Sequence, residues 1–353
     1  LANLRDWTLA PLGLDLYDGL PGVALYLAYL GEITGEERYT VLAQGALATL
    51  RRLVENAPLS TIPIGGFGGW GGVIYALTHL GKLWDAPHLL AGAEAIVERI
   101  SALIDRDEQF DMIGGAAGCI GSLLALYRCA PSERTLAAAV RCGDHLLAHA
   151  QPGQRGLGWV SKLMGERPLT GFSHGTAGIA WALLELAATT GEEPYRATAL
   201  AAVEYERSLF SRAERNWPDL REVEASAATD NGSTEFSTTW CHGAPGIGLG
   251  RLLCLRHIDD LQIGSEIKVA LETTLASGFG SNHCLCHGDL GNLELLLQAS
   301  LTLGEPRWEA EVGRMAAVIL QSIDESGWVC GNPLRVESPG LLTGLAGIGY
   351  ELL

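Results

Sequence analysis

The chain has 353 residues and a mass of 37.5 kDa, a length that suits either two domains or one large architecture. Hydrophobic residues make up 48% of it and charged residues 18%, with a mean hydropathy of +0.17, so the composition is globular and excludes disorder as the main state. Lys and Arg total 24 against 41 Asp and Glu, which gives a net charge of −17. Because such a surface repels phosphate backbones, we expect no nucleic-acid partner.

Neither the N-terminus nor the interior predicts export or membrane insertion. The first residues lack the basic start, apolar stretch and small-residue cleavage site of a secretory signal. The longest uncharged stretch, residues 56–81, is rich in Gly, Pro and Thr and contains His79, so it is not typical of a membrane span. We therefore expect a cytoplasmic chain whose eight cysteines are reduced and available as metal ligands.

A recurring Gly-x-x-Gly pattern, each copy followed by an apolar and helix-like run, organises the sequence. The first glycines of its seven copies lie between 45 and 68 residues apart, which suits a two-helix unit with loops of variable length. We call the first glycine of each copy the anchor glycine. The pairs are Gly19/Gly22, Gly69/Gly72, Gly115/Gly118, Gly175/Gly178, Gly243/Gly246, Gly288/Gly291 and Gly344/Gly347.

The second half of each unit begins at a turn signal. Residues 34–39 recur as residues 190–195 and, more loosely, as residues 303–308, each with a Gly 16 positions after the anchor glycine. This pattern predicts that one helix ends at that Gly and that the next carries Glu in its first turn. The run after an anchor is nearly all apolar, whereas the run after the turn is amphipathic, which predicts a buried inner helix and a covering outer helix.

The sequence therefore predicts an all-α fold, a closed α/α toroid of seven inner and seven outer helices, and contains no convincing strand signal. We expect the anchors to be glycine because a Cβ there would collide with neighbouring backbone where the inner helices begin close together. Converging helix N-termini would also favour anions in the shared cavity.

Reactive side chains stand immediately before three of the anchor glycines. They are His174, the dipeptide Cys241-His242 and the dipeptide Cys286-His287. If the helix starts converge, Cys241, Cys286 and His287 form a site for one zinc ion, with a fourth position left for water or substrate as in catalytic zinc sites. Zinc would deprotonate a thiol that is otherwise protonated at neutral pH, so the site would generate a substrate thiolate.

Other interpretations of these residues remain open. Buried cysteines often act only as small hydrophobic side chains, and His174 could be a structural histidine. His283 and Cys284 lie beside the third motif as alternative ligands or loop residues, and His242 follows a ligand as a residue of the surrounding shell. Cys330 has no evident partner. The four remaining cysteines lie in helix-like segments and are expected only to pack: Cys119, Cys129, Cys142 and Cys254.

The anchor motifs resemble those of lanthionine-forming cyclases, over the whole chain. The motifs that carry the resemblance are Gly171-Phe172-Ser173-His174-Gly175, Trp240-Cys241-His242-Gly243 and Cys286-His287-Gly288. The segments Leu16-Tyr17-Asp18-Gly19 and Thr343-Gly344-Leu345-Ala346-Gly347-Ile348-Gly349 resemble specifically the C-terminal cyclase domain of bifunctional class II lanthipeptide synthetases.

The resemblance implies an α/α toroid with one zinc ion held by Cys241, Cys286 and His287. It also implies a Michael-type addition of a peptide Cys thiol to dehydroalanine or dehydrobutyrine, with His174 as the acid/base histidine and Asp111 as the motif aspartate. Stand-alone cyclases often have a basic residue four positions before the first zinc cysteine and a Tyr after it. The corresponding residues here are Ser237 and His242, so those two roles do not transfer.

The chemistry also follows from the residues themselves. Attack of a thiolate on the β-carbon of a dehydroamino acid leaves an enolate, which needs a positioned acid at its α-carbon. His174 is able to accept the thiol proton and return one, Asp111 would orient it or hold it cationic, and helix N-termini would stabilise the negative charge. Asp111 has an equally simple structural interpretation as a helix cap.

Three other function classes compete with this hypothesis. A zinc prenyltransferase would need basic residues near its anchors for a lipid diphosphate, and this chain has few. An α/α-toroid glycosidase would need two facing carboxylates, and only Asp18, Asp111 and Asp289 lie near anchors. A zinc-dependent module that binds a thiol peptide or glutathione without closing a ring is compatible with the same motifs.

We expect residues 1–353 to be a single cyclase domain and a fragment of a larger synthetase, because the first anchor lies 18 residues after the first residue and the last inner helix reaches Leu353. The N-terminal dehydratase domain of class II synthetases is not in the sequence, so dehydration is not assigned to it. The expected partner is a dehydrated precursor peptide with a leader segment.

Overall fold

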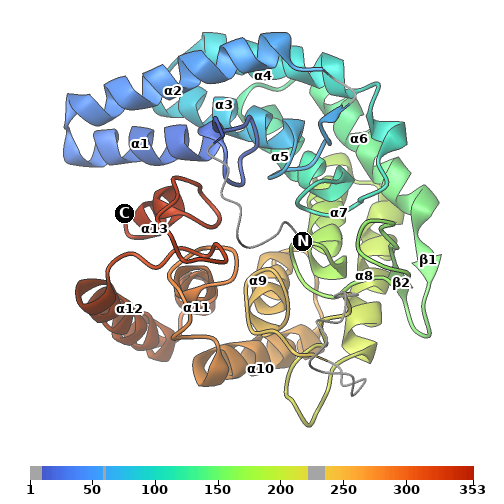
Figure 1. The fold of residues 1–353 in the computed structure, drawn as a ribbon. Helices are drawn as coiled ribbons and strands as arrows, with labels where there is room; N and C mark the ends of the chain where they lie inside the picture. Colours follow the sequence, from blue (N-terminus) through green and yellow to red (C-terminus); the bar gives the residue numbers. More distant parts are fainter. Residues whose placement is uncertain (1–9, 59–60, 222–234) are drawn as a thin grey trace.

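The computed structural model describes residues 10–58, 61–221 and 235–353, and in these ranges the fold is all-α. Seven helices form an inner ring and six form an outer layer around it (Figure 1). The inner helices are α1 (Leu20–Thr34), α3 (Trp70–Leu83), α5 (Ala116–Cys129), α7 (Thr176–Thr190), α9 (Ala244–Cys254), α11 (Asp289–Leu303) and α13 (Leu345–Glu351). The outer helices are α2 (Glu37–Asn56), α4 (Pro87–Ile100), α6 (Glu133–His149), α8 (Glu193–Ser208), α10 (Leu261–Ser277) and α12 (Pro306–Ser326).

The α/α toroid predicted from the repeat is confirmed, with one difference in number. Each of the first six inner helices packs against the outer helix that follows it in the chain. The described residues contain six outer helices, not the predicted seven, because α13 ends at Glu351 and only two residues of the sequence follow it. Outside the α-helices lie a short antiparallel pair, β1 (Gln151–Pro152) and β2 (Leu157–Gly158), and the 3-10 turn η2 (Ile104–Arg106).

Burial separates the inner helices from the outer ones, as their hydrophobic patterns predict. In α7, 11 of 15 residues are buried, whereas in α2 only Ala43, Leu47 and Leu50 are buried among 20. The inner helices therefore supply the core, and the outer helices cover it with one apolar stripe each. No helix in the described ranges combines the length and apolarity that crossing a bilayer requires.

Each anchor glycine is the N-cap of an inner helix, and the second glycine of the pair lies in the first helical turn. The second glycine is packed chiefly against its own loop. A Cβ on Gly291 would lie 1.7 Å from the carbonyl oxygen of Leu285, which precedes the same helix. The collision predicted for the anchor glycines occurs with their own loops, since a Cβ on Gly115 would lie 2.3 Å from the amide nitrogen of Phe110. Contact with a neighbouring repeat occurs at the second glycine instead, since a Cβ on Gly118 would lie 2.4 Å from the amide nitrogen of Gly66.

Gly243 gives a direct test of this packing. Its φ is +86°, and an added Cβ would lie 1.7 Å from the Ser237 carbonyl oxygen, so we expect Gly243→Ala to lower the free energy of unfolding by about 2 kcal/mol or more. The matched control is Gly45→Ala on α2, where an added Cβ meets no atom within 4 Å and helix propensity should raise stability by about 0.5–1 kcal/mol. Urea unfolding of both variants measures the two changes in the free energy of unfolding, which should have opposite signs. Equal changes in the two variants would contradict the packing argument.

A continuous circle of backbone hydrogen bonds joins the seven loops that precede the inner helices. The donor is the second residue before each anchor glycine, or in one repeat the third, and the acceptor is a carbonyl of the next loop. The links are Tyr17 to Phe67, Phe67 to Ile113, Met112 to Ser173, Ser173 to Cys241, Cys241 to Cys286, Cys286 to Leu342 and Leu342 to Tyr17, at 2.7–3.4 Å. The last link closes the toroid between its first and last repeats, where α13 also packs against α1.

Candidate functional site

The hydrogen-bonded circle of loops, here called the loop ring, sets the positions of the candidate site residues. Cys241 and Cys286 both stand two residues before an anchor glycine, in consecutive repeats. The Cys241 amide donates to the Cys286 carbonyl at 3.1 Å, so the two residues lie side by side although 45 residues of sequence separate them. The structure therefore brings the two predicted thiol ligands together.

The two thiols form a buried and unequal pair. Cys241 is 9% exposed and Cys286 is 5% exposed. A hydrogen bond from the Cys286 thiol lowers the pKa of Cys241 to about 6, despite its burial, with a smaller contribution from the Thr239 hydroxyl 3.3 Å away. The same hydrogen bond, together with burial, raises the pKa of Cys286. The pairing therefore favours the thiolate form at Cys241 over Cys286.

His287 is held by a contact that fixes which of its ring nitrogens carries the proton. Nε2 lies 2.8 Å from the carbonyl oxygen of Gly331. A carbonyl oxygen only accepts hydrogen bonds, so Nε2 carries the proton and the lone pair of Nδ1 is left available to a ligand. Carbonyl-anchored histidines of this kind are common at metal sites.

The alternative ligands are occupied by structural contacts. The Cys284 sulfur accepts a hydrogen bond from the His287 amide at 3.4 Å, and burial raises the pKa of its thiol to about 12. His283 bonds to the Ser322 hydroxyl through Nε2 and accepts the Val329 amide at Nδ1. Both residues therefore fit the interpretation as loop residues.

The residues fit a zinc ion by their chemistry, although the structure does not assemble a complete site. In the described ranges, no three His, Cys, Asp or Glu side chains meet the geometry for holding one ion together. Two observations support the fit. The two thiols lie within hydrogen-bonding reach of each other, and a third donor, His287 Nδ1, has a lone pair left free by its tautomer. Two sulfurs and one imidazole form a donor set that zinc prefers.

His174 and Asp111, the predicted acid/base pair, are joined by a hydrogen bond. His174 Nδ1 donates to Asp111 Oδ2 at 2.6 Å, while Oδ1 of the same carboxylate accepts the amides of Gly114 and Gly115 at 2.7 and 3.2 Å. Asp111 therefore orients the histidine and holds the turn that leads into α5. It is not the predicted helix cap, because the first helical amide, that of Ala116, donates to Asp107 instead. The His174 side chain is 19% exposed, which leaves Nε2 as the nitrogen free for proton transfer.

A buried ion pair supports the loop that carries His174. Glu206 Oε1 accepts the amides of Gly171 and Ala177, one at each end of that loop, at 2.8 and 3.1 Å. Its other oxygen lies 3.1 Å from Nη2 of Arg251, and both side chains are inaccessible to solvent. The loop is therefore hydrogen-bonded to a charge pair between α8 and α9. This pair holds the acid/base group on rigid elements.

The sequence prediction missed an acidic and basic pair next to the cysteines. The Arg221 side chain donates three hydrogen bonds to the Asp219 carboxylate, at 3.0, 3.2 and 2.6 Å, and Asp219 also accepts the Ser237 hydroxyl at 3.0 Å. Burial alone would raise the pKa of Asp219, but Arg221 and His242 lower it to about 2. Arg221 thus places a cation near the cysteines, although Ser237 stands at the position that is often basic in stand-alone cyclases. No motif in the sequence marks Arg221.

His242 and Tyr17 also belong to the surroundings of the cysteines. The His242 ring stacks on that of His174 with centroids 5.8 Å apart, and burial, with Arg221 nearby, lowers the pKa of His242 to about 3. His242 is therefore neutral. The Tyr17 hydroxyl donates to the Cys286 sulfur at 2.9 Å, and burial raises the pKa of Tyr17. Tyr17 stands two residues before its anchor glycine, as both cysteines do, and this shared register was the signal that could have identified it.

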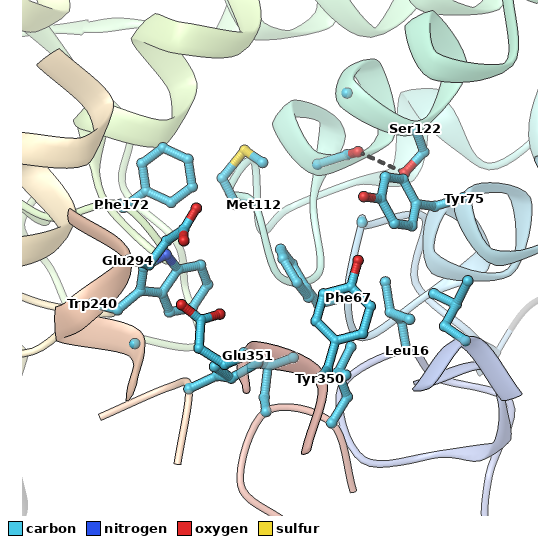
Figure 2. Close-up of a pocket in the computed structure, with 18 of the residues that line it drawn as sticks. Leu16, Phe67, Tyr75, Met112, Ser122, Phe172, Trp240, Glu294, Tyr350 and Glu351 are labelled. Carbon is cyan, nitrogen blue, oxygen red and sulfur yellow. Dashed lines mark hydrogen bonds between the residues drawn. The ribbon is translucent and has the colours of Figure 1, made fainter. Parts of the chain in front are cut away.

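A cavity of about 330 Å³ lies among the inner helices (Figure 2). Most of its lining comes from two positions of the repeat. The third residue before every anchor glycine lines it: Leu16, Gly66, Met112, Phe172, Trp240, Leu285 and Leu341. The sixth residue after the anchor lines it in six of the seven units: Leu25, Tyr75, Gly121, Trp181, Glu294 and Tyr350. The cavity is therefore the axis of the toroid, directly adjacent in sequence to the cysteine positions.

Comparison with known proteins gives one curated relative and a set of solved structures. The chain is 27% identical over 205 residues to the lacticin 481/lactococcin biosynthesis protein LcnDR2 of Lactococcus lactis subsp. lactis. That alignment covers 55% of this chain and only 21% of the relative, so the chain spans about a fifth of the length of the protein it matches.

Two solved structures share the fold. Nisin cyclase superimposes with a TM-score of 0.75 over 96% of this chain and 87% of that one, at 20% identity. An unsaturated glucuronyl hydrolase from Streptococcus agalactiae superimposes with a TM-score of 0.53 over 98% of this chain and 96% of that one, at 14% identity. At these identities the likeness concerns the toroid alone. The sequence model of the lanthionine synthetase C-like proteins matches residues 10–353, and the chain therefore belongs to that family.

Proposed function

We propose that the chain is the cyclase region of a class II lanthipeptide synthetase, which closes thioether rings in a dehydrated precursor peptide. The observation that carries the proposal is the loop ring, which joins the hydrogen-bonded pair of Asp111 and His174 to the paired thiols of Cys241 and Cys286. The class II assignment is supported by the motifs at both ends of the chain, by His242 in place of Tyr, and by the similarity to LcnDR2.

The reaction adds a peptide S–H across the double bond of dehydroalanine or dehydrobutyrine. A sulfur–carbon bond forms at the β-carbon, the carbon–carbon π bond breaks, and the α-carbon takes up one proton, so nothing is lost or oxidised. Zinc held by Cys241, Cys286 and His287 would lower the pKa of the substrate thiol. His174 Nε2 accepts the thiol proton and returns a proton to the α-carbon, while Asp111 keeps Nδ1 protonated and stabilises the imidazolium.

The structure weakens two competing functions. The three carboxylates near anchors that a glycosidase would use are committed to structural hydrogen bonds: Asp18 with Thr343, Asp289 with Gly280 and Ser281, and Asp111 with Gly114 and Gly115. A prenyltransferase needs cations for a diphosphate, yet the described residues that line the central cavity include no Lys, Arg or His.

The decisive experiment is ring closure in a dehydrated peptide that contains one Cys and one dehydroalanine. We expect the zinc-loaded chain to consume the free thiol, so that alkylation with N-ethylmaleimide adds no mass to the product. A module that only binds thiol peptides would retain zinc and bind the peptide, and every thiol would still be alkylated. That second outcome would contradict the proposal.

Tyr17 supplies a finer test of the metal site. The hydroxyl donates to a thiol that we assign as a zinc ligand, and removal of such a contact typically weakens metal binding by about 10–100-fold. We expect Tyr17→Phe to weaken zinc binding by at least about 10-fold, measured by competition with a chromophoric chelator. The matched control is Tyr127→Phe on α5, and unchanged affinity in Tyr17→Phe would show that Cys286 needs no such donor.

A further inference from the structure

The cavity on the axis of the toroid has two carboxyl groups and no opposing charge. Glu294 on α11 and Glu351 on α13 are the charged residues that line it, and its other described lining residues are apolar, aromatic or small. Figure 2 shows both carboxyl groups on the same side of the cavity as Trp240, with Tyr75 and Ser122 on the other side. Two half-buried acids side by side repel each other when both are ionised, and either a shared proton or a bound cation relieves that repulsion.

The hydrogen bonds of the two acids leave room for a further partner. Glu294 accepts the Gln298 side-chain amide at 3.0 Å, and the two carboxyl groups lie within hydrogen-bonding reach of each other. Glu351 Oε1 is buried and has no hydrogen-bond partner in the described part of the chain. Burial and the nearby Glu294 raise the pKa of Glu351 to about 9, the response expected of acids that lack a counter-ion. A buried acceptor without a donor marks the position where a ligand donor fits.

The walls of the cavity also favour a cation, in contrast to the expectation that converging helix N-termini would favour anions there. Phe172, Trp240 and Tyr350 present aromatic rings to it, and Phe172 and Trp240 have centroids 5.8 Å apart. Aromatic faces attract ammonium and guanidinium groups, and an alkyl chain gains apolar contact with the same rings. The net charge of −17 also raises the local concentration of cationic peptide segments around the protein.

We propose that this cavity is a binding site for a positively charged alkyl side chain, of the lysine or arginine type, in which Glu294 and Glu351 hold the cation and the aromatic rings hold its stem. Its assignment to a side chain of the precursor peptide rests on the proposed function. Trp240 and Leu285 line the cavity and immediately precede Cys241 and Cys286, so a residue held here belongs to the same peptide region as the reacting thiol.

Calorimetric titration with butylguanidinium chloride, in an amine-free buffer, tests the cation site without any reaction. We expect the wild-type protein to bind it at least 10-fold more tightly than 1-butanol, which has a similar alkyl stem and no charge. Glu294→Gln and Glu351→Gln should each weaken butylguanidinium binding at least 5-fold, and the double variant should abolish the preference over 1-butanol. The matched control is Glu309→Gln on the outer helix α12, an exposed residue, which should bind as the wild type does.

Equal binding of 1-butanol and butylguanidinium, or undiminished binding in the double variant, would overturn the proposal. Glutamine has the shape of glutamate and removes a buried repulsion, so we expect both variants to fold. If a variant fails to fold, the wild-type comparison of butylguanidinium, 1-butanol and butyrate decides alone, because a cation site ranks them in that order and rejects butyrate.

A kinetic comparison then places the site in the reaction. Peptides with one Cys, one dehydroalanine and either Lys or norleucine beside them should differ about 10-fold in KM in favour of Lys, with kcat unchanged. The Glu294→Gln/Glu351→Gln variant should remove this difference, and equal KM values in the wild type would refute the peptide assignment. If the wild type closes no ring in either peptide, the proposed function fails, and the calorimetric result still decides the cation site.

Discussion

Replacement of His174 by Ala should lower the rate constant for ring closure by about 10²–10⁴, because the substitution removes the group positioned to move the proton. Asp111 fixes the ring through a 2.6 Å hydrogen bond, and the side chain keeps enough exposure to reach a substrate. The measurement is the disappearance of alkylatable thiol in a dehydrated peptide under single-turnover conditions. Zinc content, determined on the same sample, should stay at the wild-type level because His174 is not one of the assigned ligands.

Asp111→Asn separates the role of Asp111 in proton transfer from its role in the turn before α5. Asn keeps an oxygen for the Gly114 and Gly115 amides, so the start of α5 should remain intact. Its amide donates to His174 Nδ1 instead of accepting from it, which shifts the imidazole proton to Nε2 and should lower the rate by about 10² or more. His88→Ala, on the exposed side of α4, is the matched control and should leave the rate of ring closure unchanged. Parental rates in both His174→Ala and Asp111→Asn would refute the acid/base assignment.

Replacement of Cys286 by Ala should remove both bound zinc and ring closure. The substitution deletes one of the two sulfurs and breaks the thiol pair whose hydrogen bond favours the Cys241 thiolate. We expect the metal content to fall from about one zinc per chain to a small fraction of that, and the rate of ring closure to fall by at least about 10². Elemental analysis after gel filtration gives the metal content, and the peptide assay gives the rate.

Two further variants complete the metal test. Cys129→Ala removes an exposed thiol at the end of α5 and should retain full zinc and activity. Cys284→Ala removes a buried sulfur next to the site, and it should retain zinc because that thiol accepts the His287 amide and its raised pKa disfavours the ligating thiolate. Loss of zinc in Cys284→Ala with retention in Cys286→Ala would move the metal site to the other cysteine.

Much of the architecture could be predicted from local patterns. The αL glycines Gly35, Gly191 and Gly304 end inner helices as the turn signal predicts, and each anchor glycine is an N-cap. These features depend on a few consecutive residues, which is why a repeat in the sequence reveals them. The seventh outer helix was predicted only by extending the repeat beyond α13, and the described residues do not contain it.

The contacts around the cysteines are ones that sequence patterns do not predict. Tyr17 contacts Cys286 across a separation of 269 residues, and Asp219 with Arg221 approaches the site from a segment outside the anchors. Asp219 and Arg221 have no periodic or motif signal, and Tyr17 shares the register of the two cysteines without that register naming its partner. The Glu294 and Glu351 pair likewise depends on α11 and α13 both facing the axis, which single helices do not specify.

The sequence by itself determined the helical repeat, the burial of alternate helices and the residue types at the start of each inner helix, because hydrophobic periodicity and glycine caps act over one or two turns. Only the tertiary structure decided which of those residues meet. The circle of hydrogen bonds between loops, closed by Leu342 and Tyr17, sets Cys241 beside Cys286 and His174 against Asp111. These pairings arise when the chain closes on itself, and closure is a property of all seven units together.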